Sequence, residues 1–178
     1  MFYIKLKLFL KTLYDFFEKI KIHSGNSNFK PNVIDGVRVL KQQMGNYDLF
    51  IFKPNVVSSH GAIIFFHGGG FVCSSPVAYQ RFLSVMAKAL GVYVFAPNYR
   101  KSPENPYPIP DEDSQHAVEY IFNSAEKFDL DRRKIILAGD SAGGFLTMSS
   151  WYRSVYIKKH SKNHTSDASR KQLYGSFN

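Results

Sequence analysis

The fold of this 178-residue chain is decided by the stretch Ile135-Ile136-Leu137-Ala138-Gly139-Asp140-Ser141-Ala142-Gly143-Gly144. It begins with an unbroken apolar run, which is typical of a parallel strand buried on both faces. It then enters a glycine-rich turn of the pattern G-x-S-x-G, in which Gly139 and Gly143 let a strand and a helix approach closely. This pattern, completed by Asp140 and Gly144, predicts a strained strand-to-helix turn that exposes Ser141 as a candidate nucleophile.

A second glycine-rich motif directly follows another apolar run and reads His67-Gly68-Gly69-Gly70. Glycines allow the backbone to approach a substrate carbonyl without a Cβ in the way. We therefore expect the N–H groups of Gly68, Gly69 and Ala142 to form an oxyanion hole, with Gly70 completing the loop. His67 has the chemistry of a general base, but we interpret it as structural, because the catalytic histidine of a G-x-S-x-G hydrolase follows its serine in the chain.

The remaining elements are predicted from the spacing of apolar residues. Residues 37–39 and 49–51 flank a turn sequence, which predicts an antiparallel hairpin. The run 92–96 predicts another buried strand, and helical spacing predicts helices over 79–90 and 111–128. Strands and helices then alternate, which predicts an α/β fold with a mostly parallel, doubly wound sheet. Both glycine motifs fall at the carboxyl ends of strands, where such sheets bind ligands.

Charge and cysteine content exclude several classes of function. The net charge is +9, but residues 1–30 carry +4, residues 152–178 carry +5, and the stretch 31–151 balances at zero. A nucleic-acid-binding domain is expected to carry its basic patch on the folded body, so we predict no nucleic-acid partner. The single cysteine, Cys73, excludes an intrachain disulfide framework and a multi-cysteine zinc site.

Several spaced motifs occur together in a fixed order: residues 67–71, the stretch Tyr99-Arg100-Lys101-Ser102-Pro103-Glu104 with Pro108 and Asp113, and residues 139–144. In this combination the chain resembles the hormone-sensitive lipase and arylacetamide deacetylase family of α/β hydrolases, from about residue 35 to residue 148. The resemblance implies hydrolysis of small-molecule or lipid carboxylic esters by Ser141, without a cofactor or metal. We also expect Arg100, Glu104 and Asp113 to form a buried ionic network.

The same resemblance implies a triad whose Asp and His follow the serine on later strands, but only 37 residues follow Ser141. We find no such loop, so we predict an N-terminal half with its nucleophile elbow and with the C-terminal strands missing. His160, His164 and Asp167 are weak substitutes, because they lie on or past a helix that leads away from the serine. We expect a truncated hydrolase that is nearly inactive as written. The alternative is a non-catalytic small-molecule-binding protein on the same scaffold.

These patterns predict three parts of the chain. Residues 1–30 form an amphipathic basic helix and a loop, residues 31–157 a partial α/β-hydrolase domain, and residues 158–178 a polar, basic and disordered tail. Apolar runs in the first part are too short for a membrane span or a secretory signal. Its helix either packs on its own domain or makes peripheral contact with a membrane surface. We accordingly expect a cytoplasmic location or one peripheral to the endoplasmic reticulum membrane.

Overall fold

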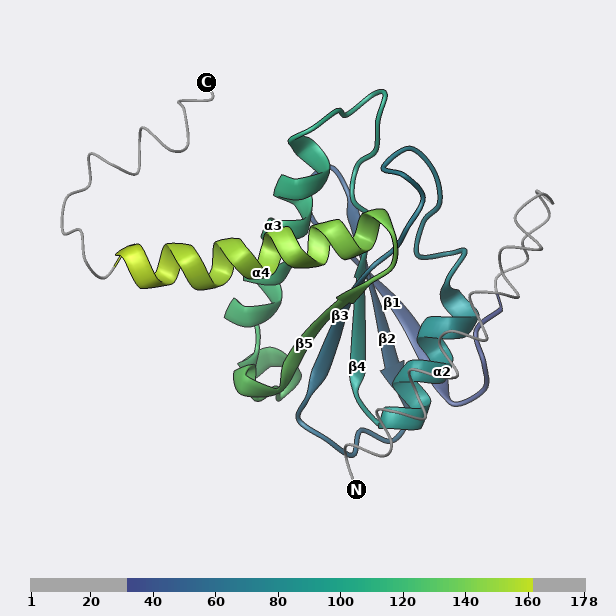
Figure 1. Ribbon diagram of the computed structural model, residues 1–178. Helices are drawn as coiled ribbons and strands as arrows, with labels where there is room; N and C mark the ends of the chain where they lie inside the picture. Colours follow the sequence, from purple (N-terminus) through teal and green to yellow (C-terminus); the bar gives the residue numbers. More distant parts are fainter. Residues whose placement is uncertain (1–31, 162–178) are drawn as a thin grey trace.

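One five-stranded sheet organises the computed structural model, which describes residues 32–161, with side chains as far as Ser154 (Figure 1). Its strands are β1 (Val37–Gln43), β2 (Asp48–Pro54), β3 (Ala62–Phe66), β4 (Tyr93–Pro97) and β5 (Ile135–Gly139). They lie in the order β1-β2-β4-β3-β5. β2 is antiparallel to β1 and β4, whereas β3 is parallel to β4 and β5, so four strands share one direction. This confirms the predicted hairpin and the three predicted strands. The run 135–138, expected to be buried on both faces, is only partly buried, because β5 lies at the edge of the described sheet.

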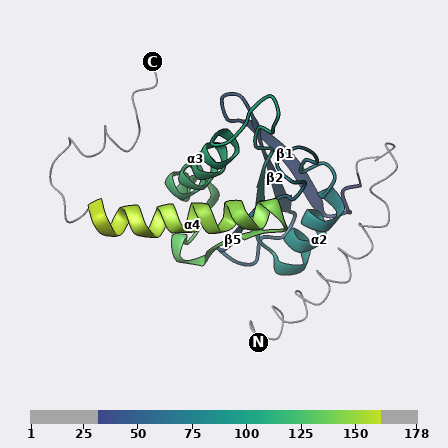
Figure 2. The same ribbon diagram turned by 45° about the horizontal axis from the view of Figure 1, so that its top comes forward.

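Helices cover both faces of the sheet, as Figures 1 and 2 show. They are α2 (Gln80–Leu90), α3 (Ile109–Asn123) and α4 (Ala142–Ser161), with short 3₁₀ turns η1 (Glu126–Phe128) and η2 (Arg132–Lys134) before β5. α2 lies on one face, and α3 and α4 lie together on the other. The doubly wound arrangement is thereby confirmed. The helix predicted within residues 1–30 lies outside the described residues.

Alternation along the strands divides the apolar core into two clusters. Phe52, Ile63 and Val94 face α2, and their neighbours in sequence face α3 and α4. On that second side Ile121 of α3 and Leu146 of α4 are fully buried against the sheet. β3 lies inside the sheet and is buried at every position, which gives the loop that follows it a rigid base.

One predicted helix boundary is wrong. The helix expected over 111–128 ends at Asn123, and Phe128 lies in η1 instead. Its ring packs edge-on against Tyr93 and Phe95, at centroid distances of 5.7 and 5.2 Å. Phe128 is apolar at this position because it contacts the core, and not because a helix continues to it. At the end of the described residues, α4 runs as far as Ser161.

The register of β3 with β5 brings the two glycine motifs together. Phe66 is paired with Gly139, so each strand ends at the same level of the sheet. The loops that begin at His67 and Asp140 therefore start side by side, although 73 positions separate them in sequence.

Candidate active site

Ser141 occupies the turn between the end of β5 and the start of α4. Its φ is +50°, in the left-handed region that residues with a Cβ rarely adopt. The turn is closed by hydrogen bonds from the N–H of Gly143 to the carbonyl of Asp140, at 2.7 Å, and from the N–H of Gly144 to that of Ser141, at 2.9 Å. The Ser141 residue is exposed. The backbone thus holds a strained serine at the sheet edge, and strain of this kind clusters at functional sites.

Gly139 and Gly143 make the turn sterically feasible. A Cβ built on Gly143 would lie 2.0 Å from the carbonyl oxygen of Phe66, and one on Gly139 would lie 2.4 Å from the carbonyl oxygen of Gly143. The close neighbours are backbone atoms, which cannot move aside as a side chain can. Strand β3, strand β5 and the first turn of α4 can therefore meet only where these two residues are glycine.

Asp140 connects the serine turn with the first glycine loop and with α2. Its carboxylate accepts hydrogen bonds from the N–H of Gly68, at 2.8 Å, and from the hydroxyl of Tyr79, at 2.9 Å. Burial raises the pKa of Asp140 above its usual value, and these two donors act in the opposite direction. The Gly68 N–H, expected at the oxyanion hole, is thus engaged by Asp140. The hydroxyl of Tyr79 was not anticipated, since helical spacing marks Tyr79 only as a core residue.

The next two glycines keep their N–H groups free of the residues that the structure describes. Gly69 and Gly70 have φ values of +125° and +63°. The Gly69 carbonyl accepts from the N–H groups of Val72 and Cys73 and from the Cys73 thiol, which fixes the loop. The Ala142 N–H, as the first of α4, has no partner within its helix. Gly69, Gly70 and Ala142 therefore offer N–H groups that a ligand can take up.

His67 is held as a structural residue of this loop. Its ring is 1% exposed and stacks on Tyr99 with centroids 4.3 Å apart. Nδ1 lies 2.7 Å from the carbonyl oxygen of Gly68, and the Tyr99 hydroxyl donates to the His67 carbonyl at 2.7 Å. Burial lowers the pKa of His67 to about 4. These contacts support the interpretation of His67 as structural.

Acid should destabilise the protein through His67. Its pKa is about 4 in the folded protein, against the ordinary histidine value of 6.5, so between these pH values the unfolded chain binds one proton more. The contribution of His67 to the free energy of unfolding is fully present above about pH 6.5. It falls by about 3 kcal/mol as the pH drops to 4. Urea unfolding of the protein and of His67→Asn from pH 4 to 7.5 measures the difference. The slope of the free energy of unfolding against pH should be smaller in the variant, by up to about 1.4 kcal/mol per pH unit.

Asp140 has a raised pKa, so its contribution to the free energy of unfolding grows as the pH falls, opposite to that of His67. This contribution is the same in the parent and in the variant. The comparison of the two proteins therefore isolates His67. Equal slopes for the parent protein and for His67→Asn would contradict the assignment of His67 as a buried, neutral residue.

Two buried carboxylates, those of Asp111 and Asp113, lie at the start of α3. Asp113 accepts a bidentate pair from Arg100, with the shortest distance 2.8 Å from Nη2 to Oδ1, and also the backbone N–H of Arg100. Asp111 pairs with Arg153 of α4. The expected ionic network is thus present for Arg100 and Asp113, but Glu104 is exposed and outside it.

The described histidines place no base beside Ser141. His60 precedes β3 at the opposite end of the sheet and contacts Asp129. His116 contacts Tyr47 in the turn between β1 and β2, at the other edge of the sheet from β5. His160 lies on the last turn of α4, about 28 Å along the helix from the serine. His164 and Asp167 lie outside the described residues.

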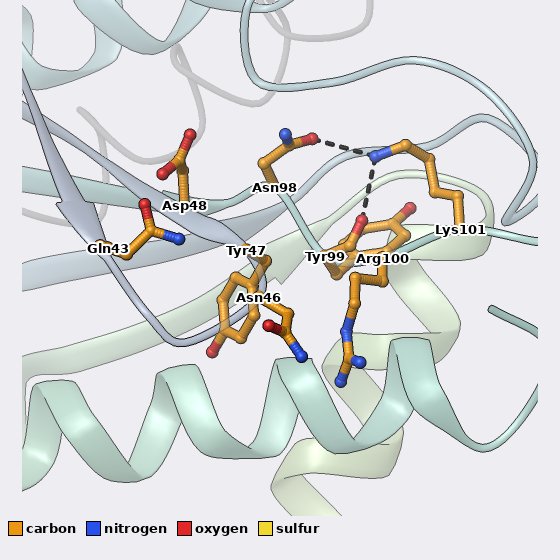
Figure 3. Close-up of a pocket in the computed structure, with 8 residues that line it drawn as sticks. All are labelled: Gln43, Asn46, Tyr47, Asp48, Asn98, Tyr99, Arg100 and Lys101. Atoms are coloured by element: carbon orange, nitrogen blue, oxygen red, sulfur yellow. Dashed lines mark hydrogen bonds between the residues drawn. The ribbon is translucent and has the colours of Figure 1, made fainter. Parts of the chain in front are cut away.

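A separate polar cavity of about 290 Å³ lies between the β1–β2 turn and the segment after β4 (Figure 3). Its lining is Gln43, Asn46, Tyr47, Asp48, Asn98, Tyr99, Arg100 and Lys101. Lys101 donates to the Asn98 side chain and the Tyr99 carbonyl, at 3.0 and 2.9 Å, while the Arg100 guanidinium is directed to Asp113. None of residues 67–70 or 139–144 lines this cavity.

Within the part of the chain that the structure describes, no three His, Cys, Asp or Glu side chains gather in a way that could hold a metal ion. In the same part, every helix is too short or too polar to cross a bilayer.

Comparison with known proteins connects this geometry with ester hydrolases. An acetyl esterase of Salmonella paratyphi B is 28% identical over 130 residues, which are 72% of this chain and 40% of that protein. An acetyl esterase of Salmonella paratyphi A is 31% identical over 64% of this chain and 36% of its own length. The chain thus spans about two fifths of the length of these relatives.

The solved structures that resemble this chain also include ester hydrolases. A hyperthermophilic esterase from the archaeon Pyrobaculum calidifontis superposes with a TM-score of 0.60 and 27% identity, over 68% of this chain and 40% of that one. An ester hydrolase from the metagenome of Lake Arreo gives a TM-score of 0.60 and 25% identity, over 70% of this chain and 41% of its own. A family model described as alpha/beta hydrolase fold matches residues 63–164, more than half of the chain. The positive φ of the elbow serine, the glycine loop beside it and these matches together show that the chain belongs to the α/β hydrolase fold family.

Proposed function

We propose that this chain supplies the nucleophile and the oxyanion-binding part of a carboxylic-ester hydrolase. The observation that carries the proposal is the φ of +50° at Ser141, next to a glycine loop that has free N–H groups. The relatives named acetyl esterase support the reaction class. The proposed substrate is a small-molecule or lipid ester.

In this mechanism Ser141 Oγ attacks the ester carbonyl carbon, and the carbonyl electron pair moves onto oxygen. The N–H groups of Gly69, Gly70 and Ala142 receive that oxyanion, and one such donor is worth on the order of 10²–10³ in rate. Collapse of the intermediate expels the alcohol and leaves an ester on Ser141, which water then hydrolyses. A base takes the serine proton and returns it to the alcohol. The described residues place no such base within hydrogen-bond reach of Ser141, so we assign that role outside them.

Covalent labelling tests the nucleophile without requiring turnover. A fluorophosphonate should form a bond from its phosphorus to Ser141 Oγ, with loss of fluoride and of the serine proton. Loss of the base costs about 10⁶ in rate in subtilisin, so we expect labelling over hours. Mass spectrometry of the digested protein locates the label.

Ser141→Ala should abolish the labelled peptide. Ser149→Ala, a change within α4 about two turns beyond Ser141, should leave it unchanged. Label that persists in Ser141→Ala, or Ser141 reacting no faster than Ser149, would contradict the proposal and favour a non-catalytic binding protein.

A further inference from the structure

The polar cavity of Figure 3 is lined by three charged side chains, of which two are neutralised by ion pairs. Arg100 is paired with the buried Asp113 at 2.8 Å. Asp48 is paired with Lys41 at 2.7 Å. Lys101 forms no ion pair with any carboxylate of the residues that the structure describes. The lining therefore carries one uncompensated positive charge.

Lys101 is partly buried, and both hydrogen-bond acceptors of its ammonium group are neutral. Nζ donates to Asn98 Oδ1 at 3.0 Å and to the Tyr99 carbonyl oxygen at 2.9 Å, and it lies 5.3 Å from the centre of the Tyr99 ring. An ammonium has three N–H donors, so one of them has no acceptor in the described part of the chain. Burial lowers the pKa of Lys101, and the charge of Asp113 acts in the opposite direction. A bound anion would provide the third acceptor and the missing negative charge.

Asn98 adds a neutral donor beside this amine. Because an ammonium can only donate, the bond from Lys101 fixes the Asn98 amide with its oxygen towards Nζ, as Figure 3 shows. Nδ2 of Asn98 therefore points away from Nζ, and it has no acceptor among residues 32–154. The Arg100 fork, which could also bind a carboxylate, is taken up by Asp113. One ammonium and one amide thus remain to bind oxygen atoms of a ligand.

We propose that this cavity binds a small molecule through a carboxylate or phosphate group, which accepts from Lys101 Nζ and Asn98 Nδ2. Both groups carry negative charge on oxygen, which is the chemistry that these two donors recognise. The volume of about 290 Å³ is near the lower end of the range typical of small-molecule sites, about 300–1,000 Å³. The inference goes beyond the proposed function and does not depend on it, because neither Ser141 nor the glycine loop lines the cavity.

Anion titration of the full 178-residue chain, labelled with nitrogen-15, tests the site by NMR. Sodium acetate is the probe for a carboxylate and sodium phosphate is the probe for a phosphate group. Both are added at pH 7, with the ionic strength held constant by sodium chloride. We expect the side-chain N–H resonances of Asn98 and the backbone N–H resonance of Lys101 to shift and to saturate at millimolar anion concentration. The probe that saturates at the lower concentration identifies the anionic group of the ligand.

Asn98→Asp is the sharpest variant, because it hardly changes the shape of the side chain. The new carboxylate accepts from Lys101 as the amide does, supplies the negative charge and removes Nδ2. The variant should unfold at the same temperature as the parent or higher, while its dissociation constant for the anion rises at least about tenfold. Lys101→Met removes the cation and keeps a long unbranched side chain, and it should raise the dissociation constant by a similar factor. Unchanged binding in either variant contradicts the proposal.

Lys127→Met is the matched control. Lys127 is exposed on η1 and does not line the cavity, so this change lowers the net charge equally and leaves the site intact. The dissociation constant should stay within about twofold of the parent value. The proposal is overturned if neither anion gives a saturable shift, or if Lys127→Met weakens binding as much as Lys101→Met. Shifts confined to Gly69, Gly70 and Ala142 would also overturn it, and would favour anion binding at the N–H groups of the proposed function instead.

Discussion

Gly143→Ala should lower the free energy of unfolding by about 3 kcal/mol or more, because the new Cβ has no room. It would lie 2.0 Å from the Phe66 carbonyl oxygen and 2.8 Å from that of His67. Either β3 or α4 must move, and both are packed into the sheet. Thermal unfolding should show a midpoint about 6–12 °C lower. The rate of Ser141 labelling should also fall, even at temperatures below that midpoint, because Gly143 belongs to the turn that holds Ser141.

Gly144→Ala is the matched control. The nearest atom to its Cβ is the Gly139 carbonyl oxygen at 3.8 Å, an ordinary contact. Alanine also favours a helix over glycine by up to about 1 kcal/mol, so this variant should be as stable as the parent or more so. Similar destabilisation by both changes would mean that close strand-to-helix packing is not what requires Gly143.

Arg100→Met should destabilise the protein by about 3 kcal/mol, through the carboxylate that it leaves behind. The Asp113 side chain is 4% exposed and accepts two guanidinium donors. Without them one backbone N–H remains as its donor among the bonds described above. Urea unfolding at pH 7 measures the loss. Adding Asp113→Leu to Arg100→Met should recover part of it, because the buried charge is then gone.

Arg133→Met is the corresponding control at the surface. Arg133 forms a similar two-pronged pair with Asp131, but its side chain is 89% exposed. Solvent screens such pairs, and the urea midpoint should stay within experimental error. A midpoint shift as large as that of Arg100→Met would indicate that the difference in burial is not decisive.

Local patterns were sufficient to predict most of the fold. The runs 62–66 and 135–138 are apolar at every position and form strands, of which β3 is buried throughout, and G-x-S-x-G can close only as a tight turn. Phe128 shows the limit of this reasoning. Its spacing fits a helix, yet its position is set by Tyr93 and Phe95, which are remote in sequence.

The same limit applies to the candidate site. The motifs predict Ser141 and the glycine loop as parts of the candidate site. They do not predict the acceptor of the Gly68 N–H, because a motif does not show which backbone N–H donates to a given carboxylate. Asp140 takes it only because the pairing of β3 with β5 brings the two loops together. The Asp111–Arg153 pair is likewise a product of helix packing, because nothing in the local sequence of either residue identifies the other as its partner.

The pairing of Phe66 with Gly139 has a consequence for the order of folding. The hairpin β1–β2 and helix α2 can form from contacts close in sequence, but β3 meets β5 only after a loop of about 70 residues has closed. The packing of β3 against β5 that holds the serine turn forms only once that closure is complete. Reactivity at Ser141 would therefore develop among the last events of folding, and its time course would report when the long-range half of the sheet is finished.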